Sequence, residues 1–199
     1  AEIPWETRQK WQQYWLVDPL DGTKEFINRN GEFTVNIALI QHHKPVLGIV
    51  HVPVTDISYF GAKDFGAWRQ QGSETAAAIE VRQPSAEPAV IVGSRSHANP
   101  ELASQLNQLG PHELVSMGSS LKFCRVAEGL ADFYPRMGPT CEWDTAAGHA
   151  LLVAAGGSLL GMDGSPLSYN RSESLLSPDF YALGDAAHPL WQELLARRF

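Results

Sequence analysis

The sequence of 199 residues contains only two cysteines, Cys124 and Cys141. Two cysteines cannot supply the disulfide framework that stabilises many small secreted domains, so the sequence favours a reducing, cytoplasmic environment. Long apolar runs are also lacking, because none approaches the roughly 18 residues that a membrane-spanning helix needs, and no signal peptide is visible. The sequence therefore predicts a globular protein without a transmembrane segment.

Positive charge is scarce as well. Fifteen Lys and Arg stand against 22 Asp and Glu, which gives a formal net charge of −7 at pH 7. No basic stripe is visible, so nucleic acid is excluded as the main partner. A small polyanionic substrate stays compatible with this charge, because metal ions can neutralise it locally.

Repeats and low-complexity tracts are absent from the printed sequence, and the pattern of apolar residues predicts two α/β lobes. We place the boundary in the Pro-containing segment 83–88, with a first lobe at 1–86 and a second at 87–199. Strands are predicted in the first lobe at 14–17, 33–40, 45–53, 57–62, 67–70 and 78–81.

The second lobe mixes both element types, which indicates helices that cover sheets in α/β or α+β layers. Strands are predicted at 89–92, 132–134 and 158–161. Helices are predicted at 100–109, from Ser119 or Ser120 to Gly129, at 145–155 and at 189–197.

Two carboxylates lie three positions apart where the first apolar run ends. Asp18 and Asp21 belong to the segment DPLDGT, which Gly22 and Thr23 complete. Asp-Pro and Asp-Gly are common turn formers, so a tight turn alone accounts for one such pair. Facing carboxylates repel unless a cation lies between them, and Mg²⁺ prefers carboxylate oxygens. With a helix starting at this turn, free N–H groups suit a phosphate, so the segment predicts phosphoryl chemistry.

A third carboxylate, Asp144, falls in the first turn of the helix predicted near 145–155. Plain N-capping explains an acid at that position, because the helix dipole favours it. The small residues Ala146, Ala147 and Gly148 would let this helix end approach another backbone closely. Asp144 could then reach the Asp18–Asp21 turn, although spacing alone does not prove the meeting.

The segments DPLDGT at 18–23 and WDTAAG at 143–148 resemble the two signature motifs of the inositol monophosphatase superfamily, which comprises metal-dependent, lithium-sensitive phosphatases. Longer segments are similar to its bacterial CysQ-type branch, the 3′(2′),5′-bisphosphate nucleotidases: YWLVDPLDGTKEFINRNGEFTVNIALI at 14–40, GSRSH at 93–97, GSSLKFC at 118–124 and GPTCEWDTAAGHA at 138–150. The likeness covers nearly the whole chain. It implies a layered αβαβα sandwich, with the first helical layer missing from this chain.

The resemblance also implies roles at the metal site. Asp18 would bridge two Mg²⁺ ions, with a third ion present in some complete sites, and the Leu20 carbonyl would bind the first ion. Asp21 and Asp144 would hold the second ion. The family places a further metal-binding Glu just upstream of the first residue here, so we expect a C-terminal portion of an enzyme that binds metal weakly. We assign that role to neither Glu2 nor Glu6.

Substrate contacts follow from the same resemblance. The backbone N–H groups of Gly22 and Thr23 would bind the scissile phosphate, and the Thr23 hydroxyl would orient and deprotonate the attacking water. In the second lobe, Lys122 or Arg136 would pair with the other phosphate, and Arg136 could instead stack on adenine. Helix capping and solvated surface charge are the plain alternatives for the second-lobe residues. The full predicted substrate-binding set is Leu20, Asp21, Gly22, Thr23, His97, Ser119, Lys122, Arg136 and Asp144.

The implied activity is Mg²⁺-dependent hydrolysis of adenosine 3′,5′-bisphosphate to AMP and phosphate, which clears a by-product of sulfate assimilation. Three alternatives stay open: inositol monophosphatase or fructose-1,6-bisphosphatase activity, a non-catalytic metal- or nucleotide-binding fragment, and a domain whose acids only form turns and caps. Relatives are cytoplasmic, and some dock on the inner bacterial membrane. The sequence leaves such docking and the oligomeric state open.

Overall fold

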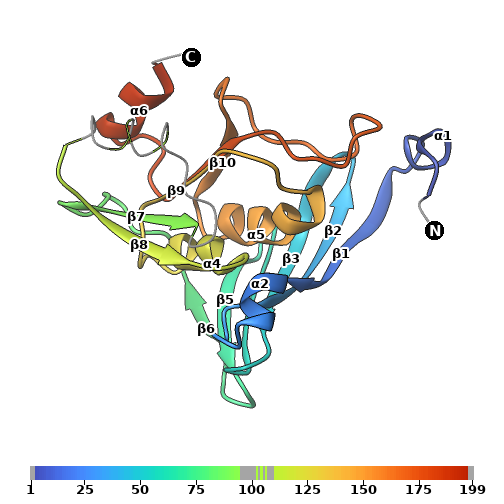
Figure 1. Ribbon diagram of the computed structural model, residues 1–199, viewed down its shortest axis with the longest axis horizontal. Helices are drawn as coiled ribbons and strands as arrows, with labels where there is room; N and C mark the ends of the chain where they lie inside the picture. The colour runs from blue at the N-terminus through green and yellow to red at the C-terminus, as the bar shows by residue number, and fades with distance from the viewer. Residues whose placement is uncertain (1–2, 95–101, 103, 105, 107–109, 197–199) are drawn as a thin grey trace.

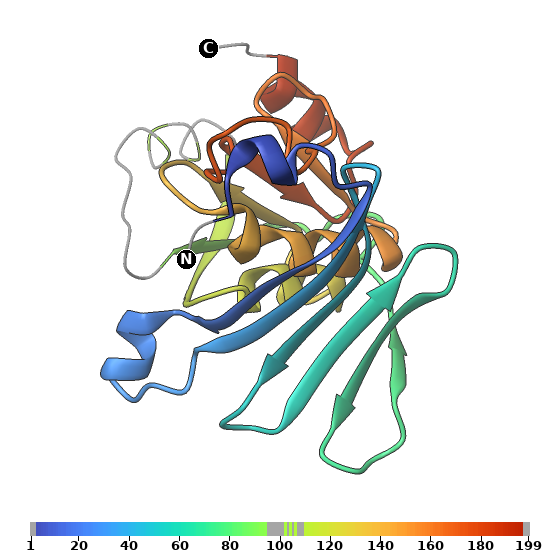
Figure 2. The ribbon, with the colours of Figure 1, turned by 90° about the vertical axis from the view of Figure 1, so that its right-hand side faces the viewer.

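The computed structural model describes residues 3–94, 102, 104, 106 and 110–196, and these form two β-sheets with helices packed on them (Figure 1). The first sheet is an antiparallel meander in the order β1-β2-β3-β4-β5-β6, and Figure 2 shows its strands side by side from blue to green. Its strands are β1 (Gln13–Asp21), β2 (Thr34–Gln41), β3 (Lys44–Val52), β4 (Ile57–Ala62), β5 (Gly66–Gln71) and β6 (Ala77–Ile79).

The second sheet has the order β10-β11-β9-β7-β8 and mixes strand directions. Strand β7 runs parallel to β8 and β9, whereas β11 is antiparallel to both β9 and β10. The strands are β7 (Ala89–Ser94), β8 (His112–Met117), β9 (Phe133–Arg136), β10 (Ser158–Gly161) and β11 (Phe180–Leu183). The described helices are α1 (Trp5–Arg8), α2 (Thr23–Ile27), α4 (Leu121–Ala127), α5 (Glu142–Ala154) and α6 (Pro189–Ala196).

Helices α4 and α5 form a layer between the two sheets (Figure 1). One continuous core joins them, with Val50 from the first sheet, Leu151 from α5 and Phe180 from the second sheet all fully buried in it. On the other side of the second sheet, Trp191 of α6 packs against Phe133 at 4.6 Å between ring centroids. The order sheet, helices, sheet, helix confirms the predicted α/β sandwich.

The close approach that the small residues predicted is present. A Cβ atom at Gly48 of β3 would overlap the carbonyl oxygen of Ala147, and a Cβ at Gly148 would overlap the ring of Phe123. Only glycine fits at these two positions, because backbone or ring atoms already fill the space of a methyl group. The start of α5 is therefore seated directly on the first sheet.

Strand β1 corrects one expectation, because the chain does not leave the sheet in a tight turn after residue 17. It stays paired with β2 through Asp21, with an irregularity between two pairs: Asp18 opposes Asn36, and Asp21 opposes Thr34. Three steps along β1 thus match two steps along β2, which is the signature of a β-bulge. Pro19 inside this segment carries no N–H group to pair, so the interruption costs the ladder little.

Other elements agree with the predictions except for two short strands. Strand β8 was not predicted, because its apolar and polar residues alternate irregularly at the sheet edge. The four-residue β11, which is buried throughout, was not predicted either. Most of the helix predicted at 100–109 lies outside the described residues. The division into lobes at 86/87 falls between the two sheets and stays a prediction, since α5 of the second part packs on the first sheet. None of the described helices is long and apolar enough to cross a membrane.

Candidate active site

The bulge in β1 aims two carboxylates to one side of the strand. Residues three positions apart on a regular strand point to opposite faces. One extra residue between Asp18 and Asp21 cancels that alternation, so both side chains face the start of α5. There they meet Asp144, and ligand oxygens of the three carboxylates lie within 4.8 Å of one another. The predicted meeting of the two motifs is thus present in the fold.

Protein donors hold each of these carboxylates from one side. Asp21 accepts its bonds on Oδ2, from the Ser120 backbone N–H at 2.7 Å and the Ser120 hydroxyl at 2.6 Å. Asp144 also accepts on Oδ2, from the Thr140 hydroxyl and the Cys141 N–H, both at 2.9 Å. Asp18 accepts the Leu20 N–H on Oδ1 at 2.9 Å. Each carboxylate also contributes one oxygen to the group of ligand atoms that lie within 4.8 Å of one another, as a cation site requires.

The three carboxylates carry an unfavourable concentration of negative charge. Burial raises the pKa of Asp18 to about 6, and repulsion from Asp21 and Asp144 acts in the same direction. The pKa of Asp21 is also raised, first by burial and then by Asp144, although the Ser120 hydroxyl bond opposes the shift. A divalent cation between the three would remove this penalty, so the donor set fits Mg²⁺.

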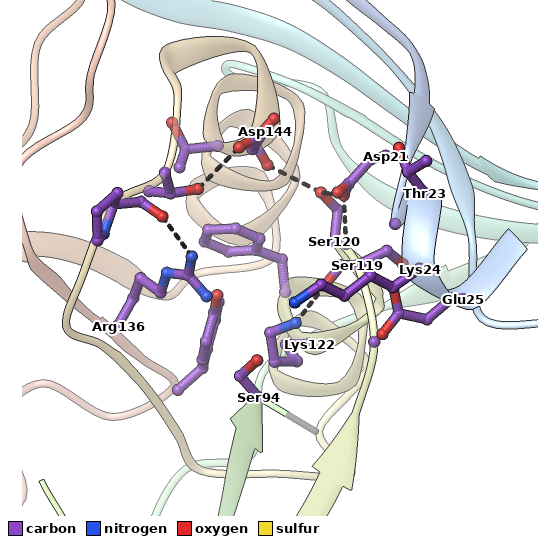
Figure 3. Close-up of a pocket in the computed structure, with 17 residues that line it drawn as sticks. Asp21, Thr23, Lys24, Glu25, Ser94, Ser119, Ser120, Lys122, Arg136 and Asp144 are labelled. Atoms are coloured by element: carbon purple, nitrogen blue, oxygen red, sulfur yellow. Dashed lines mark hydrogen bonds between the residues drawn. The ribbon is translucent and has the colours of Figure 1, made fainter. Parts of the chain in front are cut away.

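A cavity of about 270 Å³ opens beside the acids (Figure 3). The end of β1 and the first turn of α2 form one wall, with Asp21 and Thr23. Helix α4 forms the floor with Lys122, and Arg136 of β9 lies opposite (Figure 3). The lining carries the acids Asp21, Asp144 and Glu25 together with the cations Lys24, Lys122 and Arg136. Several cations beside the acids suit a substrate with more than one anionic group.

Lys122 is buried, so the alternative that it is a solvated surface charge is wrong. Its side chain is 3% exposed, and its ammonium donates to the Ser119 carbonyl oxygen at 2.6 Å. It also lies over the Tyr134 ring, 5.2 Å from the centroid. Burial lowers the pKa of Lys122 to about 8, against the pull of the nearby Asp21 charge. Burial of this cation carries a desolvation cost, and an anionic ligand in the cavity can offset that cost.

Arg136 is half-buried, and its guanidinium is incompletely paired. One terminal nitrogen donates to the Pro139 carbonyl oxygen at 2.6 Å. The buried Nε has no hydrogen-bond partner within the part of the chain that the structure describes. A guanidinium with an unpaired buried donor beside a cavity is suited to an anion.

The other predicted residues are placed as follows. Gly22 is the N-cap residue of α2 in the left-handed conformation, with φ at 84°, and Thr23 is the first helical residue rather than a side-chain cap. Ser119 and Ser120 do not cap α4 in the usual way either, since Ser120 occupies the N-cap without a side-chain bond to the helix. His97 lies outside the described residues.

Sequence reasoning missed the side chains that donate to Asp21, among them Ser120 and Asn36. The Ser120 hydroxyl was assigned to helix capping, yet it bonds the carboxylate, and Asn36 of β2 donates to the same oxygen at 3.2 Å. Asn36 is 1% exposed. A polar residue inside the apolar run 33–40 was the available signal, because a buried amide needs partners.

Comparison with known proteins places this geometry in context. Residues 3–199 match the model of the inositol monophosphatase family. The 3′(2′),5′-bisphosphate nucleotidase CysQ of Escherichia coli (strain K12) is 56% identical over 176 residues, which cover 88% of this chain and 70% of that relative. The crystal structure of CysQ from Bacteroides thetaiotaomicron, a bacterial member of the inositol monophosphatase family, superposes with a TM-score of 0.83 at 42% identity, over 92% of this chain and 74% of that one. An inositol monophosphatase from Anabaena superposes with a TM-score of 0.77 at 25% identity, over 96% of this chain and 74% of that one.

Proposed function

Since the chain belongs to the inositol monophosphatase family, we propose that it is a phosphatase of the 3′(2′),5′-bisphosphate nucleotidase type, which hydrolyses the 3′-phosphate of adenosine 3′,5′-bisphosphate to AMP and phosphate. Relatives at 56% identity, such as that of Escherichia coli, carry this activity in their names. The single observation that carries the proposal is the acid triad next to a buried cation: Asp18, Asp21 and Asp144 lie together, and the last two line a cavity whose floor holds Lys122.

The triad would hold Mg²⁺, with two or three ions in the complete site, and the Leu20 carbonyl would add a further oxygen ligand. When bound, such ions polarise phosphoryl oxygens and lower the pKa of water. Asp21 keeps its orientation through the two Ser120 donors, and Asp144 keeps its orientation through Thr140 and Cys141. Inhibition by Li⁺ is expected from the same site.

The scissile phosphate would lie at the wall formed by Gly22 and Thr23. The left-handed backbone of Gly22 turns the chain from β1 into α2, so the N–H groups that open the helix belong to the cavity wall. The Thr23 hydroxyl would orient the attacking water toward phosphorus. These residues would position the phosphate and the water rather than form covalent bonds with them.

The nucleotide part would occupy the opposite end of the cavity. Lys122 and Arg136 would bind the 5′-phosphate or, for Arg136, stack on the adenine, with Ser119 beside them and His97 as a further predicted contact. The unpaired Nε of Arg136 and the buried ammonium of Lys122 both support a ligand with a second negative group. A monophosphate such as inositol 1-phosphate would leave these cations unmatched.

The biological setting is proposed on the same basis. Hydrolysis of adenosine 3′,5′-bisphosphate would remove a by-product of sulfate assimilation. Both cysteines are free, and Cys124 is fully buried with a raised thiol pKa, so an inert core role suits it better than nucleophilic chemistry. We place the enzyme in the cytoplasm, where thiols stay reduced.

The test is phosphate release from adenosine 3′,5′-bisphosphate and from inositol 1-phosphate, each with Mg²⁺ and with a chelator. Release that needs Mg²⁺ and favours the nucleotide is the expected result. Asp144→Asn should lose roughly a hundredfold in rate or more, since a metal site supplies several kcal/mol to the transition state. Asp64→Asn is the matched control, because Asp64 is exposed in a turn whose left-handed backbone tolerates Asn. A folded chain that releases phosphate from neither substrate would contradict the proposal.

A further inference from the structure

A buried carboxylate without a place in the proposed chemistry lies two residues before Asp144. Glu142 is the first residue of α5, and its side chain is only 6% exposed. Both of its oxygens accept the backbone N–H of Asn170, at 2.8 and 3.0 Å. A buried acid is costly unless it is matched, so this bond fixes where the first turn of α5 can lie.

Asn170 in turn is held by the segment that precedes β1. Its side-chain amide donates to the Arg8 carbonyl oxygen at 2.6 Å, and the Arg8 guanidinium donates back to its Oδ1 at 2.6 Å. The same guanidinium donates to the carbonyl oxygens of Ser172 and Glu173. Arg8 and Asn170 are 7% and 3% exposed. The Asn170 side-chain amide and both terminal guanidinium nitrogens of Arg8 therefore have protein partners.

The backbone of Asn170 is shaped for this contact. Its φ is 52°, in the left-handed region that Asn visits more readily than most residues. In that conformation the residue turns its N–H toward Glu142 and its amide toward Arg8. The loop that follows β10 thus reaches out to α1, far from the second sheet (Figure 1).

We propose that Arg8, Asn170 and Glu142 form a positioning clamp that holds Asp144 in register with the two acids of β1. The clamp ties the start of α5 to the segment leading into β1, so it connects the two elements that supply the triad. Asp144 lies in the first turn of the same helix as Glu142, and a rigid turn transmits any displacement directly. The inference rests on the proposed metal site, because it assigns the clamp to the support of that site.

The measurement is direct binding of Mn²⁺, followed by electron paramagnetic resonance of the free ion, on folded protein without substrate. Glu142→Ala should weaken Mn²⁺ binding about 10-fold or more, as loss of groups that support metal ligands does. Glu142→Gln keeps one carbonyl acceptor for the Asn170 N–H, so its affinity should lie between those of the wild type and Glu142→Ala. Glu128→Ala is the matched control: the Glu128 side chain is only 9% exposed and bonded to Arg125 and Tyr59, but it follows the far end of α4.

Two further variants test the outer half of the clamp. Asn170→Gly keeps the left-handed backbone and its N–H bond to Glu142, yet removes both bonds to Arg8. It should weaken Mn²⁺ binding severalfold, and Arg8→Met should do the same. The double variant should bind Mn²⁺ with the same affinity as the single variant that binds it less tightly, because both substitutions break the same connection.

The outcomes separate this inference from the proposed function. Wild-type protein that binds no Mn²⁺ would overturn the metal site and the clamp together. Wild-type binding with unchanged affinity in folded Glu142→Ala would overturn the clamp alone. Should Glu142→Ala not fold, unchanged affinity in Asn170→Gly overturns it equally. If Glu128→Ala weakened Mn²⁺ binding as much as Glu142→Ala, the effect would reflect a general loss of stability, and this would contradict the inference.

Discussion

The Ser120 hydroxyl lies 2.6 Å from Asp21 Oδ2, and this hydrogen bond joins residues 99 positions apart in the sequence. The same hydroxyl accepts the Asn36 amide at 2.9 Å and lies 2.8 Å from the Asp144 carbonyl oxygen. One side chain thus touches β2, the end of β1 and the start of α5. It fixes the distance between the two motifs that carry the acids.

Replacement of Ser120 by alanine should therefore act on metal binding. We expect the Mg²⁺ concentration for half-maximal phosphate release to rise roughly 10- to 100-fold, because Asp21 loses its shortest orienting bond. Ser165→Ala is the control, since Ser165 makes the same 2.6 Å hydroxyl bond to a carboxylate at an exposed turn. An unchanged Mg²⁺ requirement in Ser120→Ala would show that the backbone N–H suffices to orient Asp21.

Replacement of Lys122 by methionine should weaken substrate binding and increase the stability of the fold. Below pH 8 the wild type carries a buried charge, and that cost fades between pH 8 and 10.5 because the folded pKa lies below the unfolded one. At pH 7 we expect the variant to gain about 1–3 kcal/mol in free energy of unfolding. The gain should shrink toward pH 10.5, while KM for the bisphosphate rises. Urea denaturation measures the free energy of unfolding, and steady-state kinetics measures KM. Lys63→Met is the control, because Lys63 is exposed. A loss of stability in Lys122→Met at pH 7 would contradict the prediction.

Gly48→Ala should separate α5 from the first sheet. The added methyl group would overlap the Ala147 carbonyl oxygen, and neither backbone can move without disturbing the core. We expect a loss of about 1–3 kcal/mol in free energy of unfolding, together with weaker Mg²⁺ activation, because Asp144 begins the displaced helix. Gly93→Ala is the matched control, since its Cβ would make an ordinary 3.4 Å contact with Leu114. Equal stability of the two variants would argue against the close approach.

Because His149 is buried, we expect the free energy of unfolding to depend on pH in the acid range. Burial lowers its pKa from 6.5 to about 3, so between these values the unfolded chain binds a proton that the folded chain refuses. The contribution of His149 to the free energy of unfolding is therefore lost as pH falls from 6.5 toward 3, by about 1.4 kcal/mol per pH unit. Comparison with His149→Gln, which can still donate to the Tyr169 hydroxyl, isolates this term from other groups that titrate in the same range. Parallel stability curves from pH 4 to 6.5 for the two proteins would contradict the prediction.

The candidate chemistry could be predicted from the sequence to a considerable depth. Carboxylates at 18, 21 and 144 are the right residue types for a hard cation, and glycine and threonine at 22 and 23 suit a phosphate. Strand and helix types followed from apolar spacing over most of the chain. These features are local, because side-chain chemistry and periodicity are written within a few neighbouring residues.

What the sequence by itself determined is thus the inventory of groups and the elements that carry them, while the tertiary structure decided which groups meet. The bulge that turns Asp18 and Asp21 to one face is a matter of register with β2, which no residue of β1 encodes alone. The burial of Lys122 between two sheets and the bond of Arg8 to Asn170, 162 positions away, depend on topology in the same manner. Such contacts form only after the chain has closed on itself, so their energy belongs to the whole fold rather than to any segment.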